Sequence, residues 1–276
     1  MRPVFFVVFF VNVFIYVSCG QLKGKSFVPS VPGYDESGRK IVVLKKPLRE
    51  ISGIDYTPSG KLVAINDEAG KIFLVDPATG GFEVFEFGEK GDYEDVVVAG
   101  DYFYVLRSDG HIFQVNVSNH KQVDEFENDF GKHTEFESLY YDKTLEQLVL
   151  ICKECGKHSS SVNAYRFDLN TKKFVPGIYF TIEWKEIRRM AKNNQIECKP
   201  SAAAINPVTN KLFIIASVGK VLLQCSRQGV LERVYAINSY HFQQPEGITF
   251  APNGDMYISN EGAPAKGSIL FFPYSK

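Results

Sequence analysis

The sequence has almost no net charge and few histidines. Its formal net charge is −1 over 276 residues, and it contains no basic stripe, arginine-rich arm or recognisable nucleic-acid motif. Binding to a phosphate backbone needs clustered lysine and arginine, so nucleic acid is excluded as a partner. The histidines share no common spacing, and no Ser-His-Asp or Cys-His pairing is identifiable. The five histidines are His111, His120, His133, His158 and His241.

Long apolar runs are also missing after the first 18 residues. Residues 1–18 carry one arginine and then an apolar stretch shorter than the ~20 residues of a membrane-spanning helix, which predicts a signal peptide. The stretch ends at Ser18-Cys19-Gly20 and resembles a bacterial lipoprotein box, in which the cysteine is lipidated. Tyr16 stands where leucine is usual, so ordinary cleavage or a retained anchor remain alternatives.

This N-terminal pattern predicts the cellular location of the protein. Residues 19–38 are rich in Gly, Ser, Pro and Lys, and we expect them to be a lipid-anchor tether. The protein is then expected in the bacterial cell envelope as an outer-membrane lipoprotein that contacts the membrane through lipid on Cys19.

Four further cysteines follow, and an oxidising envelope allows disulfides. Cys152 and Cys155, with His158, resemble half of a zinc site, but no second pair has matching spacing. A bridge from Cys198 to Cys152 or Cys155 is geometrically reasonable, although the sequence leaves the pairing of these three cysteines open, and Cys225 is expected to be a buried thiol.

An internal repeat dominates residues 39–276, which we expect to form one propeller domain. Five segments each predict a short strand, a tight turn and further strands. Their equivalent positions are spaced by 42, 43, 64 and 45 residues, close to one four-stranded blade per repeat. The equivalent positions are Gly53, Asp95, Ser138, Ala202 and Gly247.

Two features complete the predicted ring. Residues 184–191 place apolar side chains at helical spacing, so a short inserted helix explains the long step. The last repeat ends one strand short, and residues 40–44 are a free strand that would complete it and protect its edge. The sequence therefore predicts an all-β, five-bladed β-propeller closed by an N-terminal strand. A six-bladed ring that uses the insertion, and a β-sandwich, are the alternatives.

Carboxylates gather at one face of this predicted ring. Glu94, Glu137 and Glu246 share one repeat position, so they should point toward a common centre. Repulsion among them must be relieved by protonation, by the cations Arg107, Lys153 and Lys199, or by a metal. Oxygen ligands favour calcium. The alternative is that these acids only cap the inner strands and pair with the three bases.

The repeat starts also carry a family resemblance. Glu50-Ile51-Ser52-Gly53, Phe136-Glu137-Ser138-Leu139 and Gln244-Pro245-Glu246-Gly247-Ile248 resemble the SdiA-regulated family of bacterial propellers, which is distantly similar to NHL-repeat propellers. The resemblance implies five blades and a calcium site. Carried to matching positions, the metal ligands are Glu94, Glu137 and Glu246, with Glu50 and Asp67 nearby. Ser52 and Ser201 replace the acid in the other two repeats.

Two functions follow from this pattern. The first is a non-enzymatic binding module with an axial calcium, which presents a face to an unknown small-molecule or protein ligand. The second is a calcium-dependent hydrolase of lactonase or phosphoesterase type, in which the metal polarises the substrate. In either case Arg107 or Lys153 would contact an anionic ligand. No catalytic residue is assigned.

Replacing Cys19 with Ala should release the protein from the membrane fraction into the soluble fraction, because the lipid would have no attachment point. Fractionation of cells that express parent and variant checks this. A variant that stays membrane-bound would favour an uncleaved apolar anchor.

Overall fold

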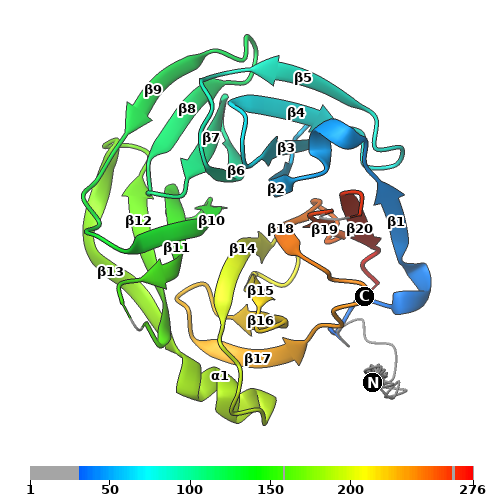
Figure 1. The fold of residues 1–276 in the computed structure, drawn as a ribbon, viewed down its shortest axis with the longest axis vertical. Coiled ribbons are helices and arrows are strands. Elements are labelled where there is room, and N and C mark those ends of the chain that lie inside the picture. Colours follow the sequence, from blue (N-terminus) through cyan, green and yellow to red (C-terminus); the bar gives the residue numbers. More distant parts are fainter. Residues whose placement is uncertain (1–30, 158, 263–264, 276) are drawn as a thin grey trace, which may run out of the picture.

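The chain forms a ring of five four-stranded blades around a central axis (Figure 1). The computed structural model describes residues 31–157, 159–262 and 265–275. The predicted signal peptide, Cys19, the first part of the predicted tether and His158 lie outside the described residues. The prediction of a five-bladed propeller is confirmed, and the six-bladed and sandwich alternatives are wrong.

The first four blades are antiparallel sheets whose strands follow one another from the axis outward. Blade 1 contains β2 (Ile51–Tyr56), β3 (Leu62–Asn66), β4 (Lys71–Val75) and β5 (Phe82–Glu86). Blade 2 contains β6 (Tyr93–Ala99), β7 (Tyr102–Arg107), β8 (Ile112–Asn116) and β9 (Gln122–Phe126). Blade 3 contains β10 (Thr134–Asp142), β11 (Gln147–Cys155), β12 (Ser161–Asp168) and β13 (Lys173–Glu183). Blade 4 contains β14 (Lys199–Asn206), β15 (Lys211–Val218), β16 (Val221–Cys225) and β17 (Leu231–Ala236).

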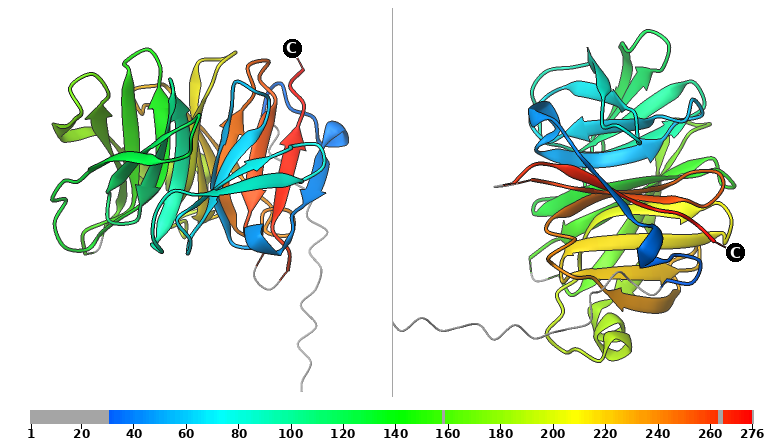
Figure 2. Two further views of the ribbon diagram at one scale, coloured as in Figure 1. Left: turned by 90° about the horizontal axis from the view of Figure 1, so that it is seen from above. Right: turned by 90° about the vertical axis from the view of Figure 1, so that its right-hand side faces the viewer.

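Blade 5 joins the two ends of the chain. It contains β18 (Pro245–Phe250), β19 (Met256–Asn260), β20 (Ser268–Phe272) and, as its outer strand, β1 (Lys40–Val43). β1 pairs antiparallel with β20, so that Lys40 lies opposite Phe271 and Val43 lies opposite Ser268. Figure 2 shows the two strands side by side at the edge of the ring. The predicted closure by the N-terminal strand is confirmed.

The described residues contain one α-helix, α1 (Trp184–Ala191), between blades 3 and 4. It ends at Lys192, which adopts the left-handed conformation and caps the helix with its backbone N–H. Ile187 is buried between β13 and β17. Two short 3-10 turns, Glu36–Gly38 and Lys46–Leu48, flank β1. In the described part of the chain, no helix is long and apolar enough to span a membrane.

The hydrophobic core is divided among the five blade boundaries. Each boundary holds one cluster of buried side chains from two adjacent blades. The three inner strands of a blade are buried on both faces, whereas outer strands such as β9 are mostly exposed. Val31 and Tyr34 also pack into the cluster between blades 4 and 5, although both fall in the segment expected to be a tether.

The five inner strands crowd together at the axis. A Cβ atom at Gly53 would collide with the Asp95 side chain, and one at Gly247 would lie 2.9 Å from Ile54 Cγ1. Asp95 is the one large side chain among the equivalent positions, and it occupies the space that Gly53 leaves. Its carboxylate accepts hydrogen bonds of 2.8 Å from the backbone N–H groups of Val96 and Leu139, which joins blades 2 and 3.

We predict that the N-terminal strand is needed for folding. A chain that starts at Lys45 should lose roughly 1.5–3 kcal/mol for each of the buried side chains Val31, Tyr34 and Leu44, and should expose the edge of β20. Chemical denaturation and light scattering should show lower stability and aggregation. The control is a chain that starts at Val31. Equal stability of the two chains would contradict this role of β1.

Candidate functional site

Three glutamates approach the axis from equivalent places on the inner strands. Glu94 lies on β6, Glu137 on β10 and Glu246 on β18. In each strand the register of pairing with the next strand shifts at this residue, so the glutamate is the extra residue of a β-bulge. Ser201 occupies the same bulge in β14, and Ser52 lies within the corresponding irregularity of β2. A bulge redirects a side chain, and here it gives the repeat position a common orientation.

The three carboxyl groups resist ionisation. Burial, followed by repulsion from Glu137 and Asp92, raises the pKa of Glu94 to about 9. Burial and repulsion from Glu137 raise the pKa of Glu246 to about 8. Glu137 and Glu246 both act on Glu94, so the structure brings the three predicted metal ligands into one electrostatic cluster, which we call the axial glutamates.

One lysine partly neutralises the axial glutamates. Lys153 Nζ contacts Glu137 and lies 3.0 Å from Glu135 Oε1. Burial opposes the charge on Lys153, but hydrogen bonds and ion pairs with Glu137 and Glu135 outweigh it and raise the pKa of the ammonium. Burial raises the pKa of Glu137, and the contact with Lys153 offsets part of this rise.

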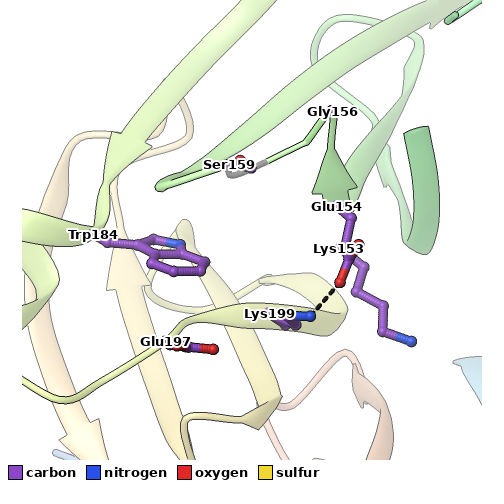
Figure 3. Close-up of a pocket in the computed structure, with 7 residues that line it drawn as sticks. All are labelled: Lys153, Glu154, Gly156, Ser159, Trp184, Glu197 and Lys199. Atoms are coloured by element: carbon purple, nitrogen blue, oxygen red, sulfur yellow. Dashed lines mark hydrogen bonds and ion pairs between the residues drawn. The ribbon is translucent and has the colours of Figure 1, made fainter. Parts of the chain in front are cut away.

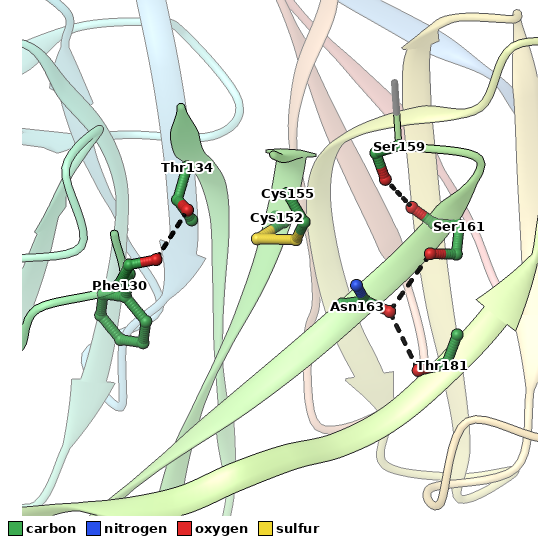
Figure 4. The surroundings of a disulfide bond; sticks show 8 residues. All are labelled: Phe130, Thr134, Cys152, Cys155, Ser159, Ser161, Asn163 and Thr181. Carbon is green, nitrogen blue, oxygen red and sulfur yellow. Dashed lines mark hydrogen bonds between the residues drawn. A yellow bond between two sulfur atoms is a disulfide. The ribbon is translucent and has the colours of Figure 1, made fainter. Parts of the chain in front are cut away.

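A disulfide closes the segment that carries Lys153. Cys152 and Cys155 are bonded to each other at the end of β11 (Figure 4). The suggested bridge from Cys198 to either of them is therefore wrong, since Cys198 is a buried free thiol. Cys225 is a buried free thiol, as expected. Lys153 itself is skipped by the strand pairing, because Cys152 pairs with Phe136 and Glu154 pairs with Glu135. The irregular pairing turns Lys153 toward Glu137.

A second acidic group lies at the boundary of blades 1 and 5. Asp67 follows β3, and burial together with repulsion from Glu50, Glu261 and Glu68 raises its pKa to about 6. The strongest repulsion on Asp67 thus comes from these acids and not from the axial glutamates. Glu50 and Asp67 interact at this boundary, and Glu261 links them electrostatically to Glu246.

The other predicted cations have partners away from the axis. Arg107 forms three hydrogen bonds to Asp109 and lies over the Phe113 ring, 5.3 Å from its centroid. Lys199 pairs with Glu154 of the neighbouring blade. Of the two predicted ligand-binding residues, Lys153 therefore lies with the axial glutamates and Arg107 does not.

The chemistry of these residues suits a hard cation. In residues 31–157, 159–262 and 265–275, no three His, Cys, Asp or Glu side chains converge closely enough to hold a metal ion. The end of the ring that carries the axial glutamates and Asp67 is nevertheless rich in hydrogen-bond acceptors that lack donors. Three buried carboxylate and amide oxygens have no hydrogen-bond partner within the described residues, namely Asn66 Oδ1, Asp67 Oδ1 and Asn260 Oδ1. Carboxylate and amide oxygens are the ligands that calcium takes.

Comparisons with known proteins agree with this architecture. The family model described as SdiA-regulated matches residues 37–266. A search of curated proteins finds no match. The chain is similar to the solved structure of a calcium-binding protein, regucalcin, from Agrobacterium tumefaciens, with a TM-score of 0.57 and 11% identity over 90% of this chain and 96% of that one. It is also similar to a protein of unknown function from Bacteroides thetaiotaomicron, with a TM-score of 0.52 and 12% identity over 80% of this chain and 59% of that one. At such identities the likeness establishes a shared fold.

The raised pKa values predict that stability falls with rising pH in metal-free buffer. Glu94 and Glu246 keep their protons up to about pH 9 and 8 in the folded protein, whereas the unfolded chain releases them near 4.5. Between these limits the folded state binds more protons, so the free energy of unfolding decreases as pH rises. Glu94→Gln should flatten this decline and add at least about 1 kcal/mol at alkaline pH, or roughly 2–4 °C in melting temperature.

Thermal melts of parent and variant across the pH range measure this effect. The control is Glu86→Gln, which removes an exposed carboxylate on the outer strand β5 and should leave the slope unchanged. A parent whose stability is independent of pH over this range would contradict the assigned burial of the axial glutamates.

Proposed function

The chain belongs to the SdiA-regulated family, and we propose that it is a non-enzymatic binding module that holds calcium at the propeller axis. The observation that carries the proposal is an imbalance of charge. Among the described residues, the three axial glutamates have one ammonium group in direct contact, that of Lys153, while Lys220 attracts Glu246 without forming an ion pair. A bound cation would supply the missing positive charge and allow all three to ionise at neutral pH.

Calcium is the cation that the side chains favour. The axial cluster offers carboxylate oxygens, and Asp67, Asn66 and Asn260 at the boundary of blades 1 and 5 offer buried oxygens that lack donors. Zinc and copper prefer nitrogen or sulfur, and magnesium demands near-ideal octahedral geometry at shorter distances. Calcium accepts ~6–8 oxygens in flexible arrangements, so water and serine hydroxyl groups can complete its shell.

Lys153 should compete with the cation. Its ammonium group contacts Glu137, which is the axial glutamate that most strongly repels both Glu94 and Glu246. A cation that binds Glu137 must therefore offset the loss of this ion pair. The competition makes the affinity adjustable through Lys153, and a variant that lacks its charge should bind calcium more tightly.

The remaining support comes from the fold and from the N-terminus. A fold shared with a calcium-binding regucalcin agrees with a cation at this face, although the sequences are only 11% identical. We further propose that lipid on Cys19 holds the module in the bacterial cell envelope, as the lipoprotein box suggests. The sequence offers no paired nucleophile and base, which favours binding over hydrolysis.

Calorimetry on the metal-stripped protein tests the proposal. Calcium should bind, and at a concentration of 100 times the dissociation constant it should add about 2.7 kcal/mol, or roughly 5–10 °C in melting temperature. Glu137→Gln and Glu246→Gln should each weaken binding at least about tenfold, because each loses a ligand and a charge. Magnesium should bind more weakly than calcium.

Two variants complete the design. Glu125→Gln removes a carboxylate far from the axis and should keep the parent affinity. Lys153→Gln should raise the affinity. If the parent binds no calcium, or if both axial variants bind as tightly as the parent, the glutamates serve only as strand caps paired with Lys153 and the proposal is wrong.

A further inference from the structure

A cavity of about 250 Å³ lies between blades 3 and 4, and Lys153 is one of the residues that line it. One wall is the indole ring of Trp184, at the junction of β13 and α1 (Figure 3). The facing wall is the Lys199–Glu154 ion pair, and Ser159 and Glu197 line the space between them. The cavity lies just below the range of ~300–1,000 Å³ that is usual for drug-sized ligands, so it suits a molecule with one ring.

Trp184 is anchored at the wall of the cavity. Its backbone N–H donates a hydrogen bond of 2.9 Å to the carbonyl of Ser160, and the ring packs against the core between blades 3 and 4. The guanidinium of Arg188, one turn along α1, lies 5.5 Å from the ring. Figure 3 shows the ring directed into the cavity.

Trp184 carries a buried donor that the described part of the chain leaves without an acceptor. Its Nε1 atom is shielded from solvent and has no hydrogen-bond partner. Buried indole N–H groups usually find a partner, and an unsatisfied one in a native protein needs an explanation. An acceptor oxygen on a bound molecule would satisfy this donor once a small rotation of the indole ring exposes Nε1 to the cavity.

The charges of the cavity select against ionic ligands. Lys199 is paired with Glu154, and Lys153 is paired with Glu137 and Glu135, so an anion would have to break an ion pair that already exists. An organic cation would lie close to two ammonium groups. Glu197 is exposed and has no ion-pair partner among the described residues, which leaves its carboxylate available as an acceptor.

We propose that this cavity binds a neutral carbohydrate ring. A sugar hydroxyl accepts the hydrogen bond from Trp184 Nε1, other hydroxyls donate to Glu197 and to the free lone pairs of Ser159 Oγ, and the apolar face of the sugar lies against the indole ring. Neutral hydroxyl groups both donate and accept, which matches walls whose charges are already paired. The site borders the axial glutamates, because Lys153 lines the cavity and also contacts Glu137.

Trp184 is the only tryptophan of the chain, so its fluorescence reports directly on the cavity. Glucose, galactose and N-acetylglucosamine are titrated to millimolar concentrations into the metal-free mature protein, with glucuronate as the anionic counterpart of glucose and choline as an organic cation. At least one neutral sugar should change the emission in a saturable way, and glucuronate should bind more weakly than glucose. No response to any neutral sugar, or a response to glucuronate or choline alone, would overturn the proposal.

Calorimetry with the best sugar then tests individual residues. Trp184→Phe keeps a flat ring but removes the donor, and it should weaken binding roughly tenfold. Glu197→Ala, at an exposed position, should also weaken binding. Arg189→Gln, on the exposed side of the same helix, should leave the affinity unchanged. If Trp184→Phe and Glu197→Ala both bind the sugar as tightly as the parent protein does, the sugar binds elsewhere.

Discussion

Convergence of five inner strands on one axis is the constraint from which the rest of the structure follows. Strands that approach so closely leave no room for side chains at Gly53 and Gly247, and Asp95 uses the space that Gly53 leaves to bond the backbone of the next blade. The same convergence gathers the bulge residues Glu94, Glu137 and Glu246 around a common centre. Packing at the axis and the proposed chemistry at its end therefore have one geometric origin.

The gathered carboxyl groups have an energetic cost that local structure only partly offsets. Lys153 supplies one positive charge, and the irregular pairing opposite the β10 bulge turns it toward Glu137. The Cys152–Cys155 disulfide restricts the short segment that carries Lys153 and Glu154. Glu154 in turn pairs with Lys199 of the next blade, so this segment connects the axial glutamates to the cavity of Trp184.

The architecture is predictable from the sequence because the same strand pattern recurs in five segments. Five similar segments determine the number of blades, a free strand at residues 40–44 determines the closure, and helical spacing near Ile187 marks the insertion. The axial glutamates are also predictable, since one repeat position places them alike. The partners of individual side chains are not predictable in this way. Arg107 turns outward to Asp109, Cys155 bonds Cys152 instead of Cys198, and Trp184 lines a cavity, because each depends on loop paths that no periodicity encodes.

The claim at the centre of this account is that the axial glutamates exceed the charge of Lys153 and so hold a calcium ion. The most direct measurement is a crystal structure of the mature protein grown with calcium at near-neutral pH, with anomalous scattering used to locate the ion. The account predicts calcium density among Glu94, Glu137 and Glu246, with the ammonium group of Lys153 displaced from Glu137. An axis without calcium density, with Lys153 still in contact with Glu137, would contradict it.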